Sequence, residues 1–542
     1  MENNEKATAW IQESGSDIPW QQPRQPRKLF DLTRKDTAFA LGAVAVCIFL
    51  SVFGIFGGFA LGYFLSLILM MTLFAVYFAK VSKLRAFAMA CGLLALMHAA
   101  VFICTTNVSV RFFSTILSFL LALVSFDGLI NGVAVGNRQT LGVFYTAAAT
   151  AGNIAAAVKS LFTNGNGDRR SIGKALVGLL CAIPVMVIVV PLLLSSDDAF
   201  RGMMDRLFSD THTTVFRVVF GVLLSVFVIA YGFSMKARRN AKCKPGKFAG
   251  IENVYIISFL SAIGLCYVLY LFSQLAYFFS AFRGFLPDGE ITYAQYARKG
   301  FFEMCVIAVI NLVLVLSALL LAKKQGGKVC HGIKALATFI AVFTLIIIAT
   351  AISKMVLYID AYGMTVLRLT TSAFMVFLSV VFVSVILRIY ITRINIVKVA
   401  LLAAGCTVLV LGIINVNAVC ARYNYESYRS GKLASIDIQS LNRLGDEGIP
   451  YIVKLAGDED TQVAQTAKEY LSTAYLYHYF DNMWTAESFS VDTLKKNEKN
   501  QGFSCYSIPR AVAYNSLYKY IEQNPEFANL CKDYFTGAAL HR

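Results

Sequence analysis

Charged residues are scarce in this sequence. Asp, Glu, Lys and Arg make up 15% of its 542 residues, and hydrophobic residues make up 57%. Soluble domains contain about 25% charged and about 45–50% apolar residues. A composition this poor in charge excludes an ordinary soluble globular protein and predicts an integral membrane protein.

The sequence also lacks the short motifs of well-known enzyme and cofactor sites. It contains no phosphate loop, no HExxH, no kinase or Rossmann fingerprint and no Ser/His/Asp arrangement. Its twelve cysteines form no CxxC pair and no Cys/His spacing typical of zinc sites. Three of them, Cys420, Cys505 and Cys531, lie in the final segment, and the sequence does not pair them. We therefore predict no catalytic residue, no metal site and no cofactor.

Long apolar runs, by contrast, are abundant. A hydrocarbon core of about 30 Å is crossed by roughly 20 helical residues. We predict eleven spans, near residues 38–56, 59–79, 86–104, 110–126, 173–195, 214–234, 254–280, 298–322, 335–352, 363–387 and 399–416. The expected fold class is all-α, a polytopic helical membrane bundle.

Lys and Arg are concentrated in alternate connections between these runs, for example at 80–85, 236–247 and 388–398. Because positive charge is retained on the cytoplasmic side of a membrane, this pattern predicts a cytoplasmic N-terminus. An odd number of spans then places the C-terminal segment outside. The net charge of +17 belongs to the membrane part, so it predicts no nucleic-acid partner. The basic loops can also attract anionic lipid headgroups, and membrane lipid is an expected partner.

We predict three regions. Residues 1–36 form a disordered cytoplasmic tail, residues 37–417 the bundle, and residues 418–542 an extracytoplasmic helical domain that resembles a HEAT hairpin. Amphipathic surface helices are expected near 140–163 and 196–209. If the first of these crossed the membrane instead, every later orientation would invert.

Polar residues recur on one face of the run that begins near residue 298. Glu303 and Asn311 share that face with Tyr296, at spacings of three to four. Charged groups within spans favour pairing, and we expect Arg368 to pair with Glu303. The candidate intramembrane polar cluster comprises Glu303, Arg368, Arg217, Tyr296, Asn311, Gln274, Tyr277 and Thr365. It can be a structural ion-pair network, a ligand or ion pathway, or an exposed interfacial girdle.

Other polar features favour a structural interpretation. His98, in the middle of the third run, is more typical of a hydrogen-bonded packing residue than of a proton relay. Asp197 and Asp198 are adjacent, so their side chains diverge on a helix, and a solvated helix start is expected. Gly58-x-x-x-Gly62 and Gly128-x-x-x-Gly132 match a helix-contact spacing that is common by chance.

Several short blocks point to a known family. These are LLLSSDDAF at 192–200, YAQYARKGFFE at 293–303, YGMTVLRL at 362–369, NAVCARYN at 417–424 and LNRLGDEGIPYIVKL at 441–455. In content and order they resemble the bacterial multipass family catalogued as domain of unknown function 4173. SIPRAVAYNSL at 507–517 is similar to a late block of that family, although FSCYSIPR departs from its pattern. The resemblance implies a bacterial cytoplasmic-membrane protein and supplies no catalytic residues.

Three classes of function fit the sequence. The first is a non-enzymatic scaffold or sensor whose external domain binds a protein partner. The second is a transporter of a small solute or lipid that uses the polar face described above. The third is a membrane enzyme that acts on lipid or cell-envelope substrates. We favour the first, because the final segment has the pattern of a folded helical domain and the bundle shows no internal repeat.

Overall fold

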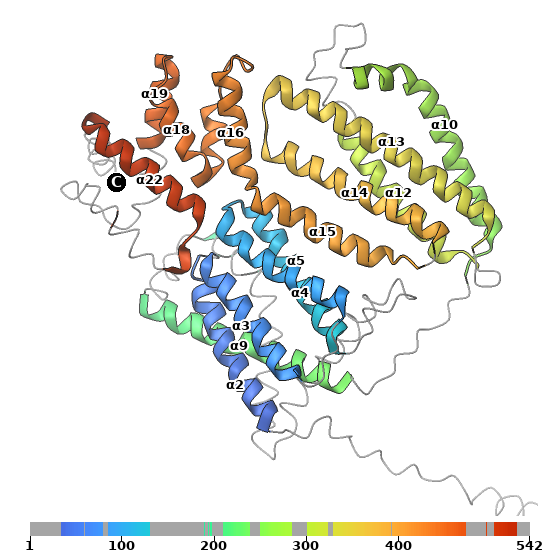
Figure 1. The fold of residues 1–542 in the computed structure, drawn as a ribbon, viewed down its shortest axis with the longest axis horizontal. Helices are drawn as coiled ribbons and strands as arrows, with labels where there is room; N and C mark the ends of the chain where they lie inside the picture. The colour runs from blue at the N-terminus through green and yellow to red at the C-terminus, as the bar shows by residue number, and fades with distance from the viewer. Residues whose placement is uncertain are drawn as a thin grey trace, which may run out of the picture.

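The computed structural model of the protein describes residues 34–58, 60–79, 85–130, 189, 193, 196–197, 210–238, 250–283, 301–323, 329–391, 393–472, 495 and 503–527. These residues form helices and one isolated β-bridge, between Ile251 and Ala322. The predicted all-α class is confirmed. Figure 1 shows a bundle of long helices with a smaller group of short helices at one end.

The bundle has two parts. The first lobe consists of α2 (Arg34–Phe49), η1 (Leu50–Ile55), α3 (Leu61–Phe78), α4 (Ala86–Cys104), α5 (Val108–Ile130) and α9 (Asp210–Arg238). The second lobe consists of α10 (Asn253–Arg283), α12 (Phe301–Leu321), α13 (His331–Tyr362) and α14 (Val366–Tyr390). Helix α15 (Ile396–Ile413) packs against α4 and α5 on one side and α14 on the other, and so joins the lobes.

Ten of the described helices are long and apolar enough to cross a membrane, and they match ten of the eleven predicted runs. The remaining run, 173–195, and the two predicted surface helices lie almost wholly outside the described residues. Large apolar side chains stay exposed along the ten helices, among them Val76, Leu93, Phe119 and Leu265. Such surfaces suit lipid rather than water. The chain is a multipass helical membrane protein.

Helix α13 extends well beyond its predicted end. Residues 335–352 were expected, whereas the helix runs from His331 to Tyr362. The apolar pattern breaks at Lys354, but that side chain is buried against neighbouring helices. The helix therefore continues past Lys354 to Tyr362. Hydropathy of the sequence alone placed the end of this helix too early.

One end of the first lobe is fixed by a buried carboxylate. The Nζ of Lys236 on α9 lies 2.7 Å from Oδ2 of Asp36 on α2, and Tyr77 on α3 donates to Oδ1 of Asp36 at 2.6 Å. The start of α2 therefore lies beside the ends of α3 and α9. At Gly221, an added Cβ would lie 2.7 Å from Cα of Ile48, so glycine there lets α9 approach the backbone of α2 closely.

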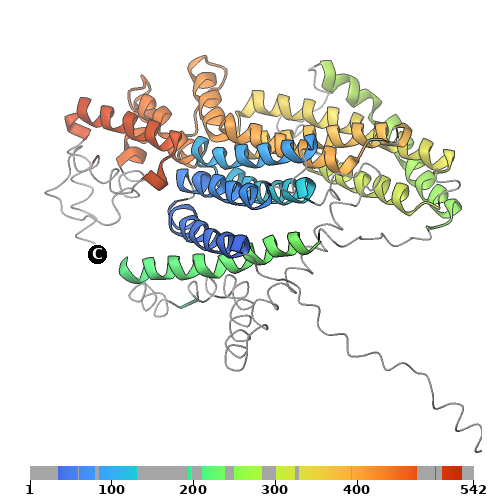
Figure 2. The same ribbon diagram turned by 60° about the horizontal axis from the view of Figure 1, so that its bottom comes forward.

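The opposite end of the bundle carries the tight turns and the C-terminal domain. Residues 105–107 separate α4 from α5, and residues 363–365 separate α13 from α14. The domain consists of α16 (Val416–Arg429), α17 (Ile438–Asn442), η2 (Gly445–Glu447), α18 (Ile449–Leu455), α19 (Thr461–Tyr470), η5 (Phe503–Cys505) and α22 (Ile508–Gln523). Figure 2 shows these helices grouped at that end, which we call the Thr105 end.

Candidate functional site

The predicted polar residues lie in separate places. Asn311 is fully buried within the second lobe, where it accepts a hydrogen bond from the Tyr267 hydroxyl at 2.5 Å and donates to Oγ1 of Thr344 at 2.9 Å. Thr344 in turn donates to the carbonyl of Ile340. Three helices, α10, α12 and α13, are thus linked in the membrane interior by a closed set of hydrogen bonds. Sequence reasoning placed Asn311 on the polar face but missed Thr344.

Arg368 lies in the first turn of α14 at the Thr105 end. Its guanidinium donates to the carbonyls of Tyr362 and Gly363, and lies 4.0 Å from the centre of the Tyr358 ring. Thr365 caps the same helix by accepting from the backbone N–H of Arg368 at 3.4 Å. Both residues therefore fix the turn between α13 and α14.

Glu303 is exposed in the first turn of α12. The carbonyl of Arg217 accepts a hydrogen bond from Ser51 at 2.6 Å, which links α9 to η1. Among the described residues, no hydrogen bond or ion pair joins Glu303, Arg368, Arg217 and Asn311 to one another. Gln274 and Tyr277 lie on α10, but their side chains are outside the described structure. Tyr296 is outside it altogether.

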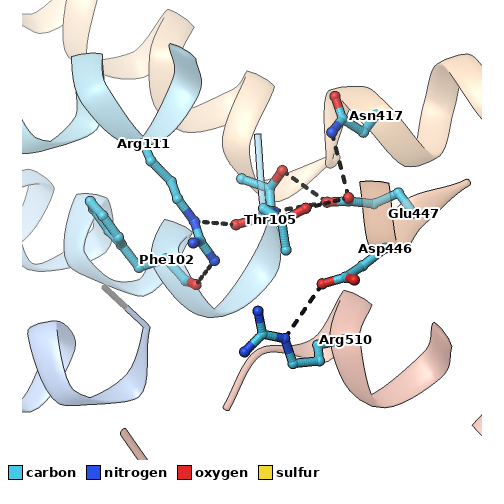
Figure 3. Close-up of polar contacts among 8 residues, drawn as sticks. Phe102, Thr105, Arg111, Asn417, Asp446, Glu447 and Arg510 are labelled. Carbon is cyan, nitrogen blue, oxygen red and sulfur yellow. Dashed lines mark hydrogen bonds and ion pairs between the residues drawn. The ribbon is translucent and has the colours of Figure 1, made fainter. Parts of the chain in front are cut away.

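A different polar cluster lies between the first lobe and the C-terminal domain (Figure 3). We call it the Glu447 junction, and it comprises Thr105, Thr106, Asn415, Asn417 and Glu447. The Glu447 side chain points from η2 into the turn between α4 and α5. Only 5% of Glu447 is exposed, although it ends a 3-10 helix of three residues. A buried carboxylate is destabilising unless it is hydrogen-bonded, so its partners decide whether the arrangement is stable.

Both oxygens of Glu447 are well supplied with donors. The backbone N–H of Thr106 donates to Oε1 at 2.8 Å, and the Thr106 hydroxyl donates to Oε2 at 2.5 Å. Nδ2 of Asn417 lies 3.5 Å from Oε2. Hydrogen bonds to an ionised acceptor are roughly twice as strong as neutral ones. These donors therefore offset much of the free energy needed to bury the charge.

The hydroxyl of Thr105 has two acceptors in reach. It lies 3.1 Å from Oδ1 of Asn415 and 3.3 Å from Oε1 of Glu447. Because a hydroxyl carries one proton, Thr105 can donate to either the α15–α16 connection or η2. Asn415 has positive φ and donates to the carbonyl of Cys104 at 2.9 Å. The end of α4 is therefore tied to the chain just after α15.

Asparagines and arginines brace this junction from both sides. Nδ2 of Asn107 donates to Oδ1 of Asn417 at 2.7 Å, while Oδ1 of Asn107 accepts from the N–H of Val110 and so caps α5. Arg111 donates to the carbonyls of Thr105 and Phe102, at 2.7 and 3.0 Å, and holds the turn from within the bundle. On the domain side, Arg510 of α22 lies 3.6 Å from Asp446.

The second lobe is held by another part of α16. We call this contact the Asn424 clamp. Nδ2 of Asn424 donates to the carbonyl of Met364 at 2.8 Å, and its Oδ1 accepts from the N–H of Met364 at 2.7 Å. Nearby, Lys432 forms an ion pair with Asp360 at 2.7 Å, and Tyr423 donates to the same carboxylate. The side-chain amide of Asn424 therefore pairs with both the N–H and the carbonyl of Met364, in the turn between α13 and α14.

Sequence reasoning named none of the central residues of these contacts as site residues. Glu447, Asn417 and Asn424 fall within blocks quoted above, at 441–455 and 417–424, and Met364 falls within 362–369. The blocks are far apart in the chain, and nothing in their spacing shows that they meet. The available signal in the sequence was that polar residues lie in the connections next to the spans. Such polarity does not show which residue forms a hydrogen bond with which.

The remaining candidates from the sequence take no part in the Glu447 junction or the Asn424 clamp. His98 is fully buried between helices, with Nδ1 3.3 Å from the Ser114 hydroxyl. Asp197 is exposed, and Asp198 lies outside the described residues. An added Cβ at Gly62 would meet the carbonyl of Phe53 in η1 and the side chain of Ser504 in η5. Gly62 therefore allows α3 to approach these two short segments closely, and not another long helix. Within the described part of the chain, no group of three or more His, Cys, Asp or Glu residues could hold a metal ion.

Comparison with known proteins identifies a family. No curated protein and no solved structure matches the chain. The family model described as "Domain of unknown function (DUF4153)" matches residues 64–455, which include most of both lobes and the Glu447 junction. The predicted resemblance to domain of unknown function 4173 is therefore wrong. Of its short blocks, 362–369 and 417–424 lie at helix ends, where turns and caps favour similar residues in different membrane proteins. With well over half of its residues matched, this chain belongs to the DUF4153 family.

Proposed function

We propose that this protein is a non-enzymatic scaffold or sensor of a bacterial cell membrane. Its N-terminus faces the cytoplasm and its C-terminal domain lies outside, where it binds a protein partner. In this proposal α16 links the partner-binding domain mechanically to the two lobes. The rest of the bundle anchors the domain and passes its position to the other side of the membrane.

The observation that carries this proposal is the attachment of one helix to both lobes. Through Asn417 and the adjoining Glu447, α16 is bonded to the turn between α4 and α5. Through Asn424 it is bonded to the turn between α13 and α14. A domain that served only as a tethered module would need neither contact. A displacement of α16 must instead act on both turns.

Sidedness is supported by the distribution of basic residues. The ends of the bundle opposite the Thr105 end carry Lys236, Arg388 and Arg393, in keeping with retention of positive charge in the cytoplasm. The test uses Ser435→Cys in the domain and Arg393→Cys in the turn before α15, each compared with the unsubstituted chain. An impermeant maleimide should label Ser435→Cys in intact cells and Arg393→Cys only after permeabilisation. The reverse pattern would contradict the proposal.

Partner binding is tested by a photo-crosslinking residue at Gln465, which is exposed on α19. A crosslinker at Phe119, exposed on a membrane-crossing helix, serves as the matched control. We expect a discrete protein adduct at Gln465 and not at Phe119, and less of it in a Glu447→Ala chain. If crosslinkers at Gln462, Gln465 and Glu469 all give no protein adduct, the partner-binding role of this surface is wrong.

A transporter is the alternative that one observation favours. Tyr267, Asn311 and Thr344 place polar groups deep within the second lobe, where ionisable and polar side chains often line pathways. In proteoliposomes, solute flux that is lost in Asn311→Leu would support transport. The proposed scaffold predicts no flux that depends on Asn311.

An enzyme that acts on lipid or cell-envelope substrates is the third alternative, and Glu303 is the best candidate for its acid. Product formation that is lost in Glu303→Gln would support this alternative.

A further inference from the structure

The segment from η5 to the first turns of α22 carries an apolar surface that the domain core does not use. Four large side chains are about half exposed there: Phe503, Tyr506, Ile508 and Val512. The opposite face of α22 is buried, with Ala513, Leu517 and Ile521 packed in the core of the domain. The exposed residues are therefore not a displaced part of that core.

This surface adjoins the edge of the membrane-crossing helices. Sγ of Cys505 donates to the carbonyl of Gly57 at 3.1 Å, and the ring of Phe503 lies 5.4 Å from that of Phe53. Residues 56–60 connect two spans, Arg34–Ile55 and Leu61–Phe78. The segment from η5 to the start of α22 is therefore held at the level where those spans leave the hydrocarbon.

Aromatic residues continue around the same edge. Phe56 packs against Phe216 and Phe220 of α9, with ring centres 5.6 and 5.5 Å apart. Phe503 and Tyr506 extend this aromatic band onto the C-terminal domain. Aromatic side chains are enriched where membrane proteins meet the lipid headgroups, so the band follows the expected boundary.

The exposed stripe of α22 changes character with distance from the bundle. At helical spacing it reads Ile508, Val512, Asn515, Lys519 and Glu522. The two apolar residues come first, next to the spans, and the charged residues come last. Figure 1 shows α22 leaving the bundle near α3 and running away from it. A helix that starts in lipid and rises into water requires this order, whereas a protein-binding stripe has no reason to follow it.

We propose that Phe503, Tyr506, Ile508 and Val512 insert into the interfacial region of the lipid bilayer. The segment thereby fixes the height of the C-terminal domain above the membrane. The occupant is lipid, since the surface adjoins the ends of two membrane-crossing helices through Phe53 and Gly57, and its apolar residues are the ones nearest those spans. This inference holds whichever compartment the domain occupies, so it does not depend on the sidedness proposed above.

Brominated lipids test this proposal on the full chain. Trp10, Trp20 and Trp484 are first replaced by Phe, and a single Trp is then introduced as Phe503→Trp or Ile508→Trp, with Lys519→Trp as the matched control on the same stripe. Each protein is reconstituted in phosphatidylcholine bilayers with and without bromine near the top of the acyl chains. An interfacial helix lies about 5–10 Å into the headgroup and acyl boundary, within reach of that bromine.

We expect bromine to reduce the fluorescence of Phe503→Trp and Ile508→Trp by roughly half, at the depth typical of interfacial helices, and to leave Lys519→Trp nearly unchanged. Equal, weak quenching at all three positions would overturn the proposal. So would blue-shifted emission at 503 and 508 without quenching, because that result means a protein surface covers them. Tyr506→Trp replaces either variant if it fails to elute as the native species in gel filtration.

Discussion

Helix α16 touches the two lobes at different points along its length, and the charged groups that take part in the two contacts differ in burial. Toward the first lobe, the contact centres on a carboxylate that is 5% exposed and receives only uncharged donors from the Glu447 junction. Toward the second lobe, it combines an amide with an ion pair whose side chains are 48% and 49% exposed. The first contact is closed to water, and the second is open to it.

This difference in burial indicates which contact can yield. Exposed ion pairs contribute little to stability, and salt weakens them. A buried acceptor whose donors come from two segments, the turn between α4 and α5 and helix α16, can be released only if several groups lose their partners together. We therefore expect the domain to stay fixed to the first lobe while its contact with the second lobe opens and closes. Opening and closing of that contact would then free or hold the turn between α13 and α14.

The largest expected effect comes from Glu447→Ala. It removes the acceptor of both the N–H and the hydroxyl of Thr106, whereas Thr105 keeps Asn415 and Asn417 keeps the carbonyl of Leu444. A donor left unsatisfied costs roughly 1–3 kcal/mol, so we expect a loss of about 2–4 kcal/mol in the free energy of unfolding. The exposed Glu459 provides a matched control, and Glu459→Ala should be close to neutral. An SDS unfolding titration of the purified proteins measures both.

Cys420 gives an independent readout of the same substitution. It lies on α16 one turn after Asn417, and burial raises the pKa of its thiol to about 12. Since the thiolate is the reactive form, Cys420 should resist alkylation at neutral pH in the native protein. Peptide mapping should find it modified faster in Glu447→Ala. If its alkylation rate does not change, the junction does not hold α16 in place.

Asn424→Ala should have a smaller effect, about 1–2 kcal/mol, because it removes two hydrogen bonds to the backbone of one turn. The N–H of Met364 loses its acceptor, so its hydrogen exchange should become faster while that of Thr106 stays slow. Asn515→Ala, on the exposed stripe of α22, is the control. If the hydrogen exchange of Thr106 becomes faster by the same factor as that of Met364, the two contacts of α16 do not open separately.

Lys432→Met should have the smallest effect and the clearest dependence on salt. The hydrogen bond to Asp360 raises the pKa of Lys432. A raised pKa means that the pair stabilises the fold at neutral pH and that this contribution disappears as the pH rises through that value. Unfolding titrations at low and high salt, with Lys519→Met as control, measure it. A loss as large as that of Glu447→Ala would show that the second contact is not the weaker one.

Much of the bundle could be predicted from the sequence, and particular residues show why. Phe119 and Leu265 belong to runs long enough to span a bilayer, and hydrophobic length depends on nearby residues only. The polar face that includes Asn311 was also predicted, because helical periodicity is local. Its partner Thr344 lies on another helix, and no periodicity links the two. Likewise, the expected pairing of Glu303 with Arg368 assumed a helix packing that the sequence does not encode locally.

Composition and the spacing of apolar runs determined that this chain is a helical membrane protein, because the bilayer imposes the same length on every span. Tertiary structure alone decided that Glu447, Thr106 and Asn417 share one buried site and that Asn424 grips the turn at Met364. Those residues are separated by up to 341 positions, and a hydrogen bond forms between groups that folding brings within about 3 Å. The sequence carries the donors and acceptors, but only the packing of the two lobes around α15 assigns each one its partner.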